Sequence, residues 1–141
     1  MGINNPNFPN GVLSETEAIQ YLGSVVNALL TQTFVDLTGS PTLTGAQAVG
    51  TVVRVSGGAT ATLTTPTAAQ VIARMQEINP NAGVGSTAHL RINNDNSGNL
   101  TVAGGTGVTL NGNTPGTLAT ATTKGYIWRI ATANTVTLTA A

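Results

Sequence analysis

The sequence contains no cysteine and very few charged residues. Among its 141 residues, five are Lys or Arg and five are Asp or Glu, so the formal net charge is zero. The absence of cysteine excludes disulfide bonds, thiolate metal ligands and a cysteine nucleophile. A charged fraction of 7% is far below the roughly 25% of an ordinary soluble domain. So little charge is typical of a subunit surrounded by other protein chains, because a solitary neutral domain tends to self-associate.

Aromatic residues are also scarce, and the basic residues are scattered. The chain has two Phe, two Tyr and one Trp, too few for a platform on which the bases of single-stranded nucleic acid stack. No run of basic residues could neutralise successive phosphates. We therefore expect no nucleic-acid partner. The basic residues are Arg54, Arg74, Arg91, Lys124 and Arg129.

No apolar run approaches the roughly 20 residues that a membrane span requires. Glu15 and Glu17 precede the first apolar stretch, and no basic residue does, which is unlike a secretory signal. Pro6 stands where an N-myristoylation motif requires Ser or Thr. The sequence thus predicts no membrane partner and assembly inside a cell.

Residues 1–41 are predicted to form an N-terminal region separate from the β-rich domain of residues 42–141. Pro6 and Pro9, together with several Asn residues, predict an extended arm over residues 1–13. The arm carries apolar side chains but has little means of folding alone, so we interpret it as a partner-binding tether, with a disordered tail as the alternative. The candidate partner-binding residues are Phe8, Pro9, Asn10, Gly11, Val12 and Leu13.

An amphipathic helix is predicted to follow the arm, over residues 14–30. Ser14 and Glu17 form a capping box, in which each side chain satisfies a backbone donor at the helix start. One apolar stripe follows at spacings of four and three residues, and it covers fewer than the three or four heptads of a sustained coiled coil. We interpret it as an oligomer or packing stripe made of Ala18, Leu22, Val25 and Leu29. Residues 31–41 are predicted to be a linker.

From Thr42 onward the hydrophobic period changes to two, with threonine alternating with Val, Leu or Ala. The chain holds twenty-five Thr and seventeen Gly, and branched threonine fits a pleated sheet while keeping its outer face wet. The turns 56–58 and 93–98 are predicted to close hairpins. The predicted strands are 51–55, 59–64, 87–92, 100–103, 107–110, 117–122, 126–131 and 135–139.

A single helix interrupts these strands in the predicted fold. It begins at Pro66 and Thr67, ends at Asn79, and buries Val71, Ile72, Met75 and Ile78. Short strands with turns every 8 to 12 residues indicate a mainly β fold. We predict a β-sandwich or barrel-like domain of about seven or eight short antiparallel strands with one inserted helix.

No catalytic, cofactor or metal site emerges from the motifs. His89 stands alone in a predicted strand, and no nucleophile motif accompanies it. Residues 83–88 imitate a dinucleotide fingerprint but follow a helix and precede a strand, the reverse of the required order. Residues 93–98 imitate the start of a calcium loop, yet Gly104 stands where the bidentate Glu is needed. We expect no enzyme, no cofactor and no small-molecule substrate.

Four segments resemble the β domain of the capsid decoration, or cement, proteins of tailed bacteriophages. The resemblance covers residues 42–141 and extends to the arm element 8–11. These segments are Thr42–Gln47, Ala59–Gln70, Val84–Thr87 and Leu100–Leu110, and the closing Thr-rich strands around 126–129 fit the same style.

The resemblance implies a homotrimer on the exterior of the capsid, assembled in the host cytoplasm, that bridges subunits of the major capsid protein. Three linked footholds would raise avidity without stronger individual contacts. One alternative is a head-fibre or tail-fibre segment that contacts a host receptor. Another is a carbohydrate-binding module, which would need exposed aromatics such as Tyr126 and Trp128 for stacking on sugars.

Overall fold

The computed structural model describes residues 3–4, 12–13, 32–112 and 116–141. The chain divides into two compact units, Met1–Gln32 and Thr33–Ala141. In the first unit, β1 (Ile3–Asn4) and β2 (Val12–Leu13) pair antiparallel, with Ile3 opposite Leu13. Both ends of the predicted extended arm are therefore paired with each other. The helix predicted over 14–30 lies outside the described residues.

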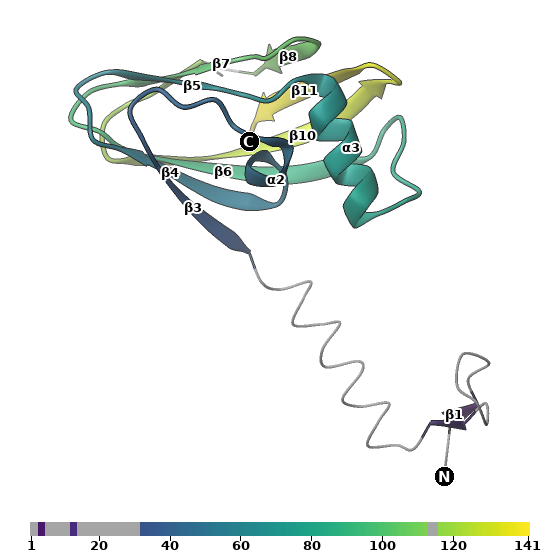
Figure 1. Cartoon of the computed structure of the whole chain (residues 1–141). Helices are drawn as coiled ribbons and strands as arrows, with labels where there is room; N and C mark the ends of the chain where they lie inside the picture. Colours follow the sequence, from purple (N-terminus) through teal and green to yellow (C-terminus); the bar gives the residue numbers. More distant parts are fainter. Residues whose placement is uncertain (1–2, 5–11, 14–31, 113–115) are drawn as a thin grey trace. The chain divides into compact units, whose positions relative to one another are not determined.

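The second unit is mainly β and consists of two sheets that lie as two layers (Figure 1). The sheets do not close into a barrel, so of the two predicted architectures only the open, layered one is compatible. The six-stranded sheet has the order β3 (Thr33–Thr38), β4 (Thr51–Ser56), β6 (Thr87–Asp95), β10 (Thr122–Thr132), β11 (Thr135–Ala140) and β8 (Val108–Asn111). The three-stranded sheet has the order β5 (Ala61–Thr64), β7 (Leu100–Ala103) and β9 (Thr117–Leu118).

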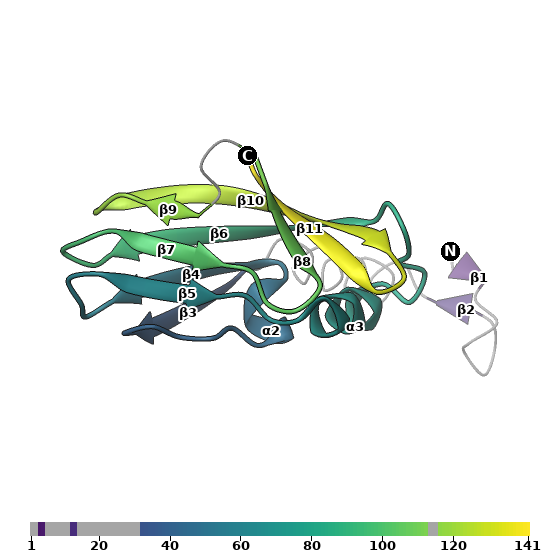
Figure 2. The same ribbon diagram turned by 90° about the horizontal axis from the view of Figure 1, so that it is seen from above.

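The prediction of antiparallel strands is wrong for much of this unit. The pairs β3–β4, β4–β6, β5–β7 and β8–β11 are parallel, whereas β6–β10, β10–β11 and β7–β9 are antiparallel. Both predicted hairpins are also wrong, because β4 and β5, like β6 and β7, belong to different sheets. Each turn crosses from one layer to the other, at the same end of the β unit (Figure 2). As a result, β4 lies beside β6 in one layer, and β5 lies beside β7 in the other.

The predicted inserted helix is confirmed as α3 (Ala68–Ile78). Its start is a capping box, in which the side chains of Thr67 and Gln70 each accept a hydrogen bond from the other's backbone N–H. Val71 and Met75 are buried as predicted, but Ile78 is 57% exposed. Ile78 is the last residue of the helix, where the apolar stripe has passed beyond the core.

The single-turn helix α2 (Gly45–Ala48) was not predicted. Thr44 and Gln47 form a second capping box at its start, so a signal for this helix is present in the sequence. The carbonyl of Ala48 accepts a 2.7 Å hydrogen bond from the indole Nε1 of Trp128. This bond joins α2 to β10 in the core, where the Trp128 side chain is fully buried.

The predicted linker contains a strand. Residues 33–38 form β3, which pairs in parallel with β4, and the compact β unit begins at Thr33 rather than at Thr42. Val35 and Leu37 pack at the margin of the core. Six residues with only two inward apolar side chains make a short alternation that is hard to distinguish from a linker.

Candidate functional site

A buried asparagine joins three chain segments where the strands pass between the layers. The two N–H hydrogens of the Asn94 side-chain amide are shared among three carbonyl oxygens, those of Gly98, Leu118 and Ala119, at N–O distances of 2.9, 3.0 and 3.1 Å. Asn94 Oδ1 accepts from the backbone N–H of Asn96 at 3.0 Å. Asn94 is fully buried, so each of these bonds replaces water that the site excludes. The sequence predicts an ordinary turn over residues 93–98, and no signal in it marks this role of Asn94.

The side chain of Asn96 extends this network to the turn between β4 and β5. Its Nδ2 donates to Asn94 Oδ1 at 2.9 Å, and its own Oδ1 accepts from the backbone N–H of Gly58 at 3.0 Å. Ser97 reaches the same turn, since its backbone N–H donates to Gly58 O at 3.0 Å. Hydrogen bonds thereby join the connections β4–β5, β6–β7 and β9–β10 at this end of the β unit.

The residues that imitate a calcium loop do not converge on a common point. The Asp95 carboxylate is paired with Arg54, while the Ser97 hydroxyl donates to the carbonyl of Gly58 at 3.3 Å. In the described part of the chain, no three His, Asp or Glu side chains come together as metal ligands. His89 is exposed on β6, and no described residue forms a nucleophile and base pair with it.

The segment that imitates a dinucleotide fingerprint is bound to β10. Gly85 N–H donates to Ile130 O at 2.8 Å, and Ile130 N–H donates to Ser86 O at 3.0 Å. The N–H of Ser86 is also engaged, since it donates to Gly83 O at 2.9 Å, and a strand, β6, follows the segment. A phosphate cradle requires free backbone donors at the start of a helix. Residues 83–88 therefore do not form the phosphate cradle of a dinucleotide-binding site.

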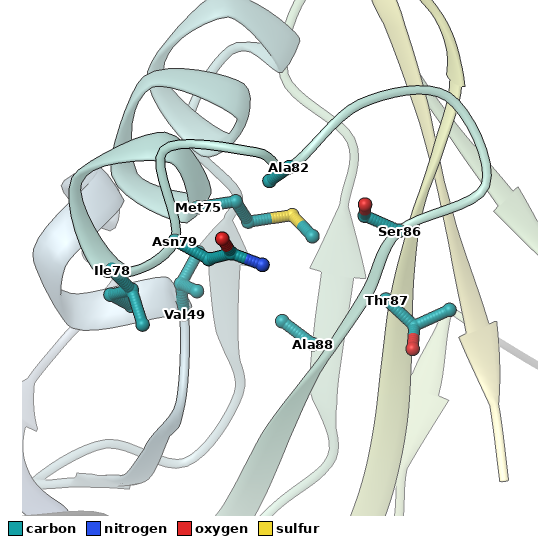
Figure 3. A pocket seen from close by; sticks show the side chains of 8 residues that line it. All are labelled: Val49, Met75, Ile78, Asn79, Ala82, Ser86, Thr87 and Ala88. Atoms are coloured by element: carbon teal, nitrogen blue, oxygen red, sulfur yellow. The ribbon is translucent and has the colours of Figure 1, made fainter.

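A small cavity lies between the end of α3 and the start of β6 (Figure 3). Its empty volume is about 310 Å³, part of which is open solvent. Its polar side chains are engaged locally: Asn79 Oδ1 accepts from Asn81 N–H at 3.1 Å, and Ser86 Oγ accepts from Gly83 N–H at 3.0 Å. No set of polar groups converges on the space. The lining residues are Val49, Met75, Ile78, Asn79, Ala82, Ser86, Thr87 and Ala88.

An ion-pair group crosses three strands on the outer face of the six-stranded sheet. Arg54 on β4 lies 3.2 Å from Asp36 on β3 and also contacts Asp95 on β6 with two of its nitrogens. The hydrogen bonds to Asp95 and then Asp36 raise the pKa of Arg54 above its ordinary value. All three side chains are substantially exposed, so the group contributes little to stability.

The remaining basic residues of this face have no acidic partner among the described residues. Arg91 on β6 and Arg129 on β10 are both exposed. Arg91 lies opposite Gly125, and Arg129 lies opposite Thr87. Threonines of β11 continue the same face. The outer face thus presents hydroxyl groups, two separated cations and the exposed Phe34, without a catalytic arrangement.

Tyr126 and Trp128, the two aromatic residues named for stacking on sugars, are not available for stacking on a ligand. Tyr126 and Trp128 are 1% and 0% exposed. Burial raises the pKa of Tyr126 to about 12. A carbohydrate-binding site displays such rings at its surface, so these two residues do not support that alternative; among the described aromatic residues Phe34 is the exposed one.

The predicted partner-binding residues are described only in part. Val12 and Leu13 form β2, while Phe8, Pro9, Asn10 and Gly11 lie outside the described residues. The stripe Ala18, Leu22, Val25 and Leu29 also lies outside them. The structure therefore brings no predicted partner-binding side chains together, and both assignments stay predictions.

Comparison of the chain with family models, with curated proteins and with solved structures found no match. Neither α2 nor α3, the helices of the described residues, has the length and apolar character that crossing a membrane requires.

Proposed function

We propose that the chain is a structural virion protein, a capsid decoration protein that binds the outer surface of a tailed-phage head. In this proposal it acts by binding energy alone, as a homotrimer that bridges subunits of the major capsid protein. The division of the chain carries the proposal. A compact β unit begins at Thr33, and a separate unit of residues 1–32 precedes it.

That division suits a body with an attachment element. The β unit contains all five basic residues and three of the five acidic ones, whereas Glu15 and Glu17 are the only charged side chains of residues 1–32. The Thr-rich strand β11 carries no charge, and the exposed charges of the neighbouring strands are few and separated. Such a surface is suited to dense packing among other subunits, where repulsion between like-charged neighbours would be a disadvantage.

Two experiments test the proposal: imaging of virus particles and deletion of the N-terminal arm. Cryo-electron microscopy of virions carrying this chain should place it over the whole shell, at threefold or quasi-threefold positions. Density confined to a fibre or a tail would favour the receptor-binding alternative, and absence from the particle would overturn both virion roles.

A deletion of residues 1–13 should abolish attachment to particles and leave the trimer intact by light scattering. The control is the substitution Thr109→Ala on the exposed side of β8, which should attach normally. Full attachment without the arm would remove its assigned role, and a monomeric full chain would count against the trimer.

A further inference from the structure

β3 (Thr33–Thr38) is the longest edge strand of the two sheets of the β unit. It has six residues, compared with four each in β5 and β8 and two in β9. The edge of β5 is covered from within the chain, since Thr64 N–H donates to Pro41 O and Thr64 O accepts from Leu43 N–H, both at 2.9 Å. No described segment covers β3 in this way (Figure 2).

The backbone of β3 presents unused hydrogen-bonding groups on its far side. Gly39 N–H donates to Ser56 O at 3.1 Å. Because N–H and C=O directions alternate along a strand, the groups of Val35 and Leu37 face β4 and those of Phe34, Asp36 and Thr38 face outward. Among the described residues, none of those three donates or accepts a backbone hydrogen bond on the outward side.

The usual devices that block an exposed edge are absent from β3. Proteins protect such edges with proline, lysine, bulges or inward charges. The register of β3 against β4 runs without a shift from Thr33 to Thr38. Its one charged residue, Asp36, is paired with Arg54 at 3.2 Å. This edge is therefore regular and locally neutralised, which permits another strand to add to it.

We propose that the β3 edge is a contact between two copies of the chain, in which the two β3 strands pair antiparallel about a twofold axis at Val35. Directly opposite residues of an antiparallel pair carry their side chains on the same face of the sheet, so the inner face of one β3 has to meet the inner face of the other. This is the case only when the twofold axis passes through a residue rather than between two residues. An axis at Asp36 would set two carboxylates directly opposite, which is destabilising. An axis at Phe34 or Leu37 pairs fewer residues of the strand.

An axis at Val35 brings like faces of the two strands together and sets no two carboxylates opposite each other. Phe34 lies opposite Asp36 of the second copy, so no like charges meet. On the inner face, Thr33 lies opposite Leu37 of the second copy and the two Val35 side chains meet. Val35 and Leu37 are only partly buried in one chain, and the pairing covers them. The contact closes with two copies, so it is separate from the proposed threefold contact and would join neighbouring trimers on a shell.

The test uses single-cysteine variants, which are clean because the chain has no cysteine. With Val35 groups facing β4, the two Val35 residues form a non-hydrogen-bonded pair, with Cα atoms about 4.5 Å apart, within reach of a disulfide. Full-length Val35→Cys should give a disulfide-linked dimer under mild oxidation. Leu37→Cys, on the same face but opposite Thr33, and Thr109→Cys on β8 should link at least about fivefold more slowly, because neither residue opposes itself.

Two further variants, made in the Val35→Cys chain, test the strand pairing itself. Phe34→Pro removes an outward N–H and leaves the β3–β4 bonds intact, so it should reduce the linked dimer about fivefold or more. Phe34→Ala keeps the N–H and should link normally. Circular dichroism checks that both fold.

Equal rates for Val35→Cys and Thr109→Cys would overturn the proposal, as would faster linking of Leu37→Cys than of Val35→Cys. The outcome is independent of the proposed function, because cross-linking needs only the purified chain. A linked dimer without attachment to particles would remove the virion role alone.

Discussion

A β-carbon added to Gly98 would lie 1.7 Å from the carbonyl oxygen of Ala59. Gly98 belongs to the connection between β6 and β7, and Ala59 belongs to the connection between β4 and β5. The two connections are also hydrogen-bonded, since Ser97 N–H donates to Gly58 O at 3.0 Å. They stack on each other so closely that only a residue without a side chain fits at position 98.

We therefore expect Gly98→Ala to destabilise the β unit. Because the clash is with backbone rather than with a flexible side chain, the cost should be about 1–3 kcal/mol or more. Urea unfolding measures it as a lower midpoint. Gly83→Ala is the matched control: a β-carbon there meets nothing within 4 Å, so the midpoint should barely change. Equal midpoints for the two variants would contradict the close stacking.

Asn94→Asp should destabilise the fold by on the order of 1–3 kcal/mol, because three carbonyl oxygens lose a buried donor. A carboxylate facing those oxygens has a raised folded-state pKa. Stability is then highest below the unfolded value of about 3.9 and is lost as the pH rises through the folded-state pKa.

Unfolding of this variant at several pH values tests both parts of that prediction. The control is Asn111→Asp, which makes the same chemical change at an exposed position of β8. It should unfold like the parent chain at every pH. A loss of stability at Asn94→Asp that did not depend on pH would argue against the donor role of the amide.

Tyr126 should make the β unit sensitive to alkali. Burial raises its folded-state pKa from 10.0 to about 12. A tyrosine is neutral below its pKa, and burial favours the neutral form. The contribution of the buried, neutral Tyr126 to the free energy of unfolding is therefore fully present below pH 10 and is lost as the pH rises through about 12. Alkaline unfolding monitored by phenolate absorbance should show one late-titrating group that Tyr126→Phe removes. An unchanged titration in that variant would assign the late group elsewhere.

Thr67→Ala should cost about 1 kcal/mol, because the first turn of α3 loses the side chain that accepts from Gln70 N–H. Thermal unfolding measures the change. Thr109→Ala, an exposed threonine of β8 without a cap, serves as the comparison. A smaller effect at Thr67 than at Thr109 would show that packing alone holds α3 in place.

Patterns within a few residues of sequence predicted those helices and strands that depend on neighbouring residues, such as capping residues and alternating apolar side chains. The limits of α3 follow from Thr67 at its start and Asn79 at its end. Period-two alternation located the strands from β4 onward, except that the predicted strand 117–122 is divided between β9 and the start of β10, and it missed β3. The same alternation could not reveal which strands pair. A strand that crosses to the other layer and one that turns back in a hairpin both place alternate residues in the core.

The network around Asn94 could not be predicted for a related reason. In sequence, an Asn-rich segment before a glycine indicates an exposed turn. The residues that hydrogen-bond to this segment, Gly58 to Asn96 and Leu118 to Asn94, are distant from it in the chain. Only the stacking of the three connections brings these backbone carbonyls and amides within hydrogen-bonding distance.

The sequence by itself determined a mainly β unit with a capped helix, few charges and no thiol chemistry, because composition, capping and hydrophobic period act over a few residues. The tertiary structure decided the parallel pairing, the two layers and the exposed β3 edge. Those depend on contacts between residues far apart in the chain, where close packing at Gly98 and the hydrogen bonds of Asn94 select one arrangement among several that the same alternation allows.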